Sequence, residues 1–235
     1  MRGAVLAKRH VMWAPWTDPP GLEDVLLRLR DDGAFLSGLI LRGGGSGVRF
    51  RYVAELDVRW RLRSIRFNRL GVPGRDSGWG LSVDEDGTWR NDSGVEHSFL
   101  AGRVGLDMTG TPITKTLLLR KLDLAVGESA EVDVAHIMVP GLKLERRPQR
   151  YTRLGDRDYR VEGPDSTISY NDDRRVEDAV HEFEVDEDGL VLDWPGHFRR
   201  VWTFDREAAA REAEQIIVKR HEKEEKADPN GSIPG

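Results

Sequence analysis

The sequence has no cysteine, which excludes disulfide bridges and thiolate metal ligands and is compatible with a reducing compartment. It has no uninterrupted apolar run near the ~18 residues that a membrane-spanning helix needs. The apolar segment in residues 1–10 is also too short for a secretory signal. We therefore expect a cytoplasmic chain without a transmembrane segment.

Signals for catalysis, metals and nucleic acids are equally scarce. The net charge of −5 argues against nucleic acid as a partner. The 6 histidines stand in no recognised metal-ligand spacing, and no G-x-S-x-G motif is present. The glycine-rich residues 43–47 lack the lysine and the following helix of a phosphate-binding loop. We expect no catalytic residues of these kinds, no metal and no cofactor.

What the sequence does contain is a series of short apolar segments separated by turn residues. With 235 residues and 38% apolar composition the chain can form one sizeable core, and its 25 glycines favour many short strands. Residues 23–30 suit either a helix or a strand, and residues 50–70 suit one long strand with a bulge near Arg63. Further strands are expected at residues 34–42, 81–83, 88–90, 102–108, 131–139, 141–147, 149–154, 158–162, 180–186, 190–194 and 197–204.

Residues 111–122, with the sequence TPITKTLLLRKL, are β-branched and apolar after a proline that cannot donate to a ladder. They predict a strand that is covered on both faces. Arg120 lies between two leucines of its own face, where a guanidinium needs a partner because burying a lone charge is costly. Asp107 and Asp193 are the leading candidates for that partner.

Residues 193–196 predict a tight turn between two adjacent antiparallel strands, with Pro195 second and Gly196 third in a type II turn. At the C-terminal end, Asp205 suits the N-cap of a helix over residues 205–226, and residues 227–235 suit a disordered tail. Residues 1–204 would then form a single β-rich domain. The expected fold is mainly β: a large, curled antiparallel sheet or half-barrel with one C-terminal helix.

Three motifs together resemble a bacterial family of glycolipid-binding proteins, formerly a domain of unknown function. They are TPITKTLLLRKL at residues 111–122, QRY at residues 149–151 and GLVLDWPGHFRR at residues 189–200. Glu23, residues 58–60 and residues 106–107 fit as well, so the resemblance covers roughly residues 13–204. Lys115 stands where the family has asparagine, and Leu118 where it has proline.

The resemblance implies a β-rich fold like the half-barrels that carry lipoproteins across the bacterial periplasm, and it implies a lipid or glycolipid as ligand. We expect a protein without enzymatic activity that holds an amphiphile in a curled sheet. An enzyme acting on a lipid or sugar derivative through Asp107 or Asp193 is one alternative, and a structural scaffold without a ligand is the other. The positions that match the family nominate as ligand-binding residues Trp60, Asp107, Thr114, Arg120, Gln149, Tyr151, Asp193 and Arg199.

Overall fold

The computed structural model describes residues 3–44, 47–71, 78–102, 105–139, 141–164 and 178–204. The chain divides into two units, residues 1–202 and residues 203–235, and only Thr203 and Phe204 of the second are described. The predicted helix over residues 205–226 and the tail over residues 227–235 therefore lie outside the described residues.

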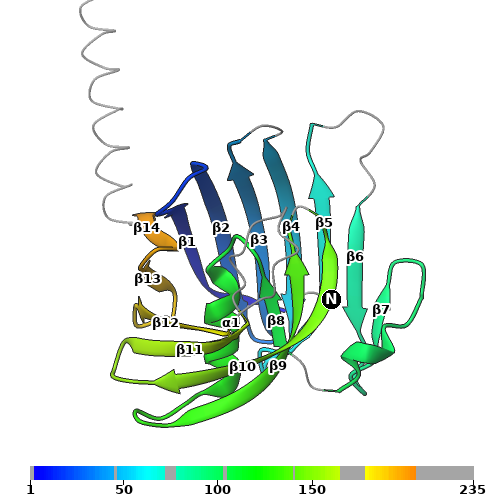
Figure 1. The fold of residues 1–235 in the computed structure, drawn as a ribbon. Coiled ribbons are helices and arrows are strands. Elements are labelled where there is room, and N and C mark those ends of the chain that lie inside the picture. The colour runs from blue at the N-terminus through cyan, green and yellow to red at the C-terminus, as the bar shows by residue number, and fades with distance from the viewer. Residues whose placement is uncertain are drawn as a thin grey trace, which may run out of the picture. The chain divides into compact units, whose positions relative to one another are not determined.

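The first unit is built on one sheet of 14 strands, in the order β7-β6-β5-β4-β3-β2-β1-β14-β13-β12-β11-β10-β9-β8 (Figure 1). The prediction of a mainly β fold is confirmed. The strands are β1 (Val5–Pro15), β2 (Gly21–Arg30), β3 (Gly33–Arg42), β4 (Val48–Leu56), β5 (Leu62–Arg69), β6 (Trp79–Val83), β7 (Trp89–Asn91), β8 (Gly105–Met108), β9 (Ser129–Met138), β10 (Lys143–Arg153), β11 (Asp158–Pro164), β12 (Asp178–Val185), β13 (Val191–Trp194) and β14 (Phe198–Thr203).

Alternating burial along the strands shows why these segments pair as a sheet with one covered face. In β3 the residues Ala34, Leu36 and Ile40 are buried, and their neighbours in the sequence are more exposed. Residues 23–30, for which helix and strand were both open, lie in β2, with Glu23, Val25 and Leu27 buried at every second position. Burial at every second residue is the pattern of a strand that is covered on one side only, so it distinguishes the strand from the helix here.

The segment predicted as a central strand is instead a helix, α1 (Ile113–Leu122). The Thr111 side chain accepts a hydrogen bond from the Ile113 N–H at 3.1 Å, and the helix ends at Asp123, whose backbone is left-handed with φ of 47°. Every residue from 113 to 119 is buried, so the helix carries no polar stripe that would reveal a period of 3.6. A threonine followed by proline at a helix start was the signal that this prediction overlooked.

The helix also explains the parallel pairing of β8 with β9. β8, α1 and β9 follow one another along the chain, and β8 pairs with β9 in parallel. Parallel neighbours need a crossover connection, which α1 supplies. The sheet is therefore mixed, whereas a purely antiparallel sheet was expected. It is open, with β7 and β8 at its two edges, so it does not close into a barrel.

Residues 50–70 form two strands, so the predicted single strand is wrong, but the predicted bulge near Arg63 is confirmed. The register of β4 with β5 shifts between the pairs Glu55–Ser64 and Leu56–Leu62, which leaves Arg63 without an opposite residue. β4 and β5 pair as a hairpin through the turn at residues 57–61. The Asp57 carboxylate accepts hydrogen bonds from the N–H groups of Arg59 and Arg61 at 2.8 and 2.9 Å. The change in apolar parity between Leu62 and Ile65 marks the bulge in β5, just after this turn.

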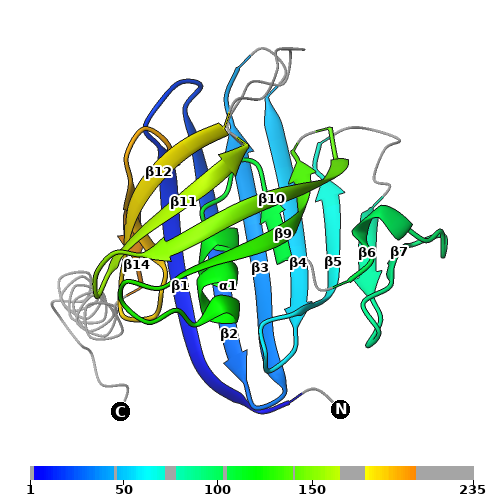
Figure 2. The same ribbon diagram turned by 60° about the horizontal axis from the view of Figure 1, so that its bottom comes forward.

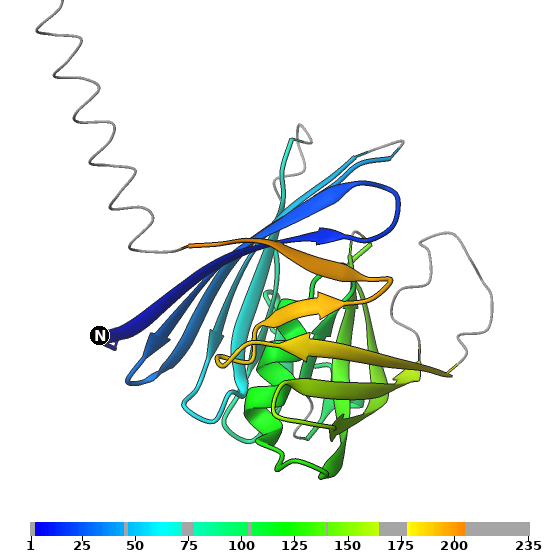
Figure 3. The ribbon, with the colours of Figure 1, turned by 90° about the vertical axis from the view of Figure 1, so that its left-hand side faces the viewer.

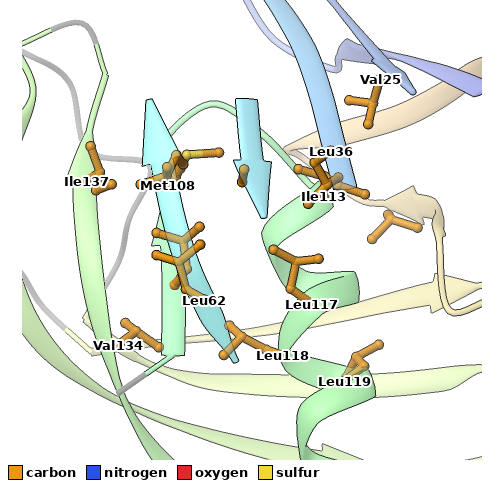
Figure 4. Packing of buried hydrophobic residues seen from close by; sticks show 14 of the residues in the cluster. Val25, Leu36, Leu62, Met108, Ile113, Leu117, Leu118, Leu119, Val134 and Ile137 are labelled. Carbon is orange, nitrogen blue, oxygen red and sulfur yellow. The ribbon is translucent and has the colours of Figure 1, made fainter. Parts of the chain in front are cut away.

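The concave side of the sheet is filled by α1. The helix lies between β2 to β4 on one side and β9 to β11 on the other (Figure 2), and a view from the side shows the sheet curling around it (Figure 3). Side chains of the helix meet side chains of both halves of the sheet (Figure 4). The labelled core residues are Val25, Leu36, Leu62, Met108, Ile113, Leu117, Leu118, Leu119, Val134 and Ile137.

Candidate functional site

The residues nominated from the sequence separate into three groups in the structure. Asp107, Thr114, Gln149 and Tyr151 belong to a buried hydrogen-bond network. Asp193 and Arg199 lie opposite one another on β13 and β14. Trp60 and Arg120 line a groove at the C-terminal end of α1. The sequence pattern alone gives no means of telling these groups apart.

The buried network is centred on the Asp107 carboxylate of β8, which is 1% exposed. Oδ1 accepts a hydrogen bond from the Thr114 hydroxyl at 2.8 Å, and the Lys115 ammonium lies 3.1 Å from both oxygens. Oδ2 accepts from Gln149 Nε2 at 2.8 Å, and His136 Nδ1 lies 3.3 Å from it. The helix, β9 and β10 are thus tied to β8 at one carboxylate.

Burial alone would raise the pKa of Asp107, because a charge is poorly solvated in the core. The Lys115 ammonium, His136 and the Gln149 amide outweigh burial and hold this pKa well below its usual range. A carboxylate that stays charged and accepts from several donors is unsuited to donating a proton as a general acid. The Asp107 carboxylate is therefore placed to hold α1, β9 and β10 to β8.

Asp193 and Arg199 are organised around Trp16. The indole Nε1 of Trp16 donates to Asp193 Oδ1 at 2.8 Å, and the Arg199 guanidinium lies 4.7 Å from the centre of the Trp16 ring. The predicted turn that follows Asp193 is confirmed: the His197 N–H donates to the Trp194 carbonyl at 2.9 Å, and Gly196 has φ of 77°. Trp16, Asp193 and Arg199 thus form a cluster of their own, and none of the three lines the groove at the end of α1.

The groove, called here the α1 groove, has a volume of about 850 Å³. Its walls come from the C-terminal end of α1 and from three turns, between β4 and β5, β10 and β11, and β12 and β13. The lining residues are Val58, Arg59, Trp60, Leu119, Arg120, Lys121, Asp123, Leu124, Arg153, Asp156, Arg157, Tyr159, Val185, Asp186, Glu187 and Gly189.

Arg120 has a different partner from the one expected. Its Nε and Nη2 donate to the Asp188 carbonyl at 3.0 and 2.6 Å, and Nη2 lies 3.4 Å from the Asp188 carboxylate. The guanidinium also lies 5.2 Å from the centre of the Trp60 ring. Asp107 and Asp193 were expected because Arg120 was placed on a strand; on the last turn of α1 it points to the turn between β12 and β13 instead.

Sequence reasoning missed the residues that the turn between β10 and β11 contributes to the groove. Arg153 donates to the carbonyls of Leu124, Gly155 and Asp156, and its guanidinium lies 5.7 Å from the centre of the Tyr159 ring. Nothing in the local sequence links residues 153–159 to α1, because the curl of the sheet brings them together.

Within the described residues, no helix is both long and apolar enough to cross a bilayer.

The fold and the groove define the class as an open, curled β-sheet protein with a helix packed inside it. A family model described as "Putative glycolipid-binding" matches residues 10–200. A crystal structure of a DUF1089 family protein from Pseudomonas aeruginosa is 30% identical, with a TM-score of 0.60, over 79% of this chain and 95% of that chain. No protein with a curated description matches the sequence. The chain belongs to the family that this family model describes.

Proposed function

We propose that this chain binds a glycolipid and that the α1 groove holds the polar headgroup. The observation that carries the proposal is the meeting of Trp60 and Arg120, two residues nominated by separate family motifs, at 5.2 Å in one groove. A volume of about 850 Å³ lies within the range of small-molecule sites, which is roughly 300–1,000 Å³.

The proposed ligand site is the α1 groove, whereas the sequence led us to expect an amphiphile inside the curled sheet. The cavities that α1 borders inside the sheet, next to Lys115 and next to Leu118, have volumes of about 10 Å³ each. A space of that size holds about one water molecule. The buried network around Asp107 is therefore proposed as support for α1, which in turn positions Arg120.

Flotation of the full chain with vesicles tests the proposal. We expect the protein to float with phosphatidylcholine vesicles that contain monogalactosyl diacylglycerol, and to stay unbound with phosphatidylcholine alone. Arg120→Met should weaken flotation at least about tenfold, since the charge-assisted hydrogen bonds that fix this groove are lost.

Arg66→Met is the matched control, because Arg66 lies on β5 in an exposed pair with Asp92 and does not line the groove. Equal flotation of the two variants, or equal flotation with and without the galactolipid, would contradict the proposal and favour a scaffold without a ligand. The cytoplasmic location expected from the sequence stays a prediction, which fractionation of the host cell tests.

A further inference from the structure

Four hairpin loops of the described chain share one geometry: residues 57–61, 84–88, 91–95 and 186–190. In each loop the N–H of the first residue donates to the carbonyl of the fifth, and the N–H of the fourth donates to the carbonyl of the first. The fourth residue is left-handed in all of them, with φ of 59° at Trp60, 88° at Gly87, 78° at Gly94 and 73° at Gly189. Three of these loops use glycine at this position, and one uses tryptophan.

Glycine is the expected residue there, because a left-handed backbone brings Cβ of any other residue against its own peptide group. A bulky aromatic residue in that region is an outlier that persists only where the surroundings hold it. The matched loops show that this chain forms the same turn readily with glycine. The strain at Trp60 therefore points to a use for its ring that is separate from making the turn.

The Trp60 ring packs partly against the buried core, and Arg120 links it to the neighbouring loop of the same geometry. Arg120 lies over the Trp60 ring at 5.2 Å and donates to the carbonyl of Asp188 in the loop at residues 186–190. One arginine at the end of α1 thus joins the two loops. Trp60 is half-buried and lines the α1 groove, as Gly189 of the second loop does.

The charges of the groove are mixed, and two of its cations, Arg120 and Arg153, already have partners in the protein. Its lining has the cations Arg59, Arg120, Lys121, Arg153 and Arg157, and the carboxylates Asp123, Asp156, Asp186 and Glu187. The Arg120 guanidinium donates hydrogen bonds to the Asp188 carbonyl, and the Arg153 guanidinium donates to three backbone carbonyls. A phosphate or carboxylate headgroup only accepts hydrogen bonds and needs a cluster of available cations. Each sugar hydroxyl both donates and accepts, which suits a lining of both signs.

From these observations we propose that Trp60 stacks against the ring of an uncharged sugar headgroup, and that the α1 groove discriminates against anionic headgroups. This inference rests on the proposed function of the groove. The indole offers a flat apolar surface to the C–H face of a pyranose, while the other charged side chains of the lining, among them Arg59, Arg157 and Glu187, take its hydroxyls.

The headgroup class is tested by flotation of the full chain with three kinds of vesicle: phosphatidylcholine alone, with monogalactosyl diacylglycerol, or with phosphatidylglycerol. We expect binding to the galactolipid vesicles only. Trp60→Phe should keep part of this binding because a ring remains, whereas Trp60→Leu, which keeps apolar bulk without a ring, should lose at least about tenfold.

The strain is tested by thermal unfolding without lipid. Trp60→Gly and Trp60→Ala lack the ring equally and differ only in Cβ. Gly94→Ala introduces Cβ into a loop of the same geometry where nothing lies within 4 Å. We expect Trp60→Gly to have a higher melting midpoint than Trp60→Ala. The difference should be about as large as the one by which the unaltered chain exceeds Gly94→Ala, because each pair differs by one Cβ at a left-handed position.

The outcomes separate this inference from the proposed function. Preferred binding to phosphatidylglycerol vesicles overturns the headgroup class and leaves lipid binding standing. Binding by Trp60→Leu at the level of the unaltered chain overturns the role of Trp60, as does a Trp60→Gly variant no more stable than Trp60→Ala. Absence of binding to all three vesicles overturns the proposed function and this inference together.

Discussion

Glu23 of β2 is a carboxyl group at the covered face of the sheet, 1% exposed. Tyr52 of β4 donates its hydroxyl to Glu23 Oε1 at 2.6 Å. Burial raises the pKa of Glu23 to about 7, although the hydrogen bond from Tyr52 and the charge of Arg42 oppose that rise. The protonation of this one buried side chain therefore acts inside the covered face of the sheet, where β2 and β4 are joined by the Tyr52 hydroxyl.

This raised pKa predicts that the protein loses stability as the pH rises from about 4.5 to about 7. Below the ordinary value of 4.5 Glu23 is protonated in both the folded and unfolded states, and its contribution to stability is fully present. Between these two pH values Glu23 is already ionised in the unfolded state but still protonated in the folded state. The free energy of unfolding therefore falls by ~1.4 kcal/mol for each pH unit, or about 3 kcal/mol in total. Urea unfolding at about pH 5 and about pH 8 measures this loss.

Glu23→Gln is the control for this pH dependence, because its amide keeps the shape of the protonated carboxyl and does not titrate. The variant should show a much smaller difference between the two pH values. A pH dependence of the same size in the variant would mean that other groups cause it.

Lys115 is the partner that keeps the Asp107 carboxylate charged inside the core. Lys115→Met should destabilise the protein by roughly 3–5 kcal/mol, because the carboxylate is left buried and uncompensated. The double variant Lys115→Met with Asp107→Asn should recover part of that loss, since it removes the charge as well. Chemical denaturation of the single and double variants gives the coupling between the two residues; a double variant no better than the single one would contradict it.

At the scale of the element, α1 presents Arg120 from its last turn to the loop between β12 and β13. The side chain is 31% exposed, so Arg120→Met should destabilise by only about 1–2 kcal/mol, through lost hydrogen bonds to the Asp188 carbonyl. The larger loss expected for a fully buried pair does not apply. A loss above about 3 kcal/mol by urea unfolding would show that the guanidinium is more deeply desolvated than its exposure indicates.

The turn between β13 and β14 gives a second prediction at this scale. Gly196 has φ of 77°, and no atom lies within 4 Å of the place that a Cβ would occupy, so a larger side chain meets strain and no clash. Gly196→Val should destabilise by roughly 1–2 kcal/mol. Gly196→Asn should lose less, because asparagine tolerates the left-handed region. Equal melting midpoints for the two variants would contradict this account.

The elements that the sequence predicted well are those whose evidence is local. The turn at residues 193–196 and the strands on either side of it follow from proline and glycine at fixed positions. α1 was missed because a helix buried on every side lacks the polar stripe that distinguishes it from a buried strand. The hairpin at residues 57–61 was missed because Trp60 stands where the turn calls for glycine.

At the scale of the whole molecule, the site depends on how the sheet curls. The α1 groove joins three turns and a helix end that are distant in the sequence, and no local pattern encodes their meeting. Of the residues that the family motifs nominated as ligand-binding, Trp60 and Arg120 line the groove. Asp107, Thr114 and Gln149 instead form the buried network. Matching the family motifs identifies both the groove-lining residues and the buried network residues, and only the packing in the structure distinguishes them.

The strand order predicts which part of the C-terminal region the fold needs. β14 lies between β1 and β13, so it joins the N-terminal half of the sheet to the C-terminal half. A chain ending at residue 204 keeps that junction and should unfold in one cooperative transition, with a midpoint close to that of the full chain. A chain ending at residue 197 loses β14, exposes the edges of β1 and β13 and removes the buried Phe198. It should be strongly destabilised or unfolded. Calorimetry of the two shortened chains measures the contrast, and similar midpoints for both would show that the two halves fold without the junction.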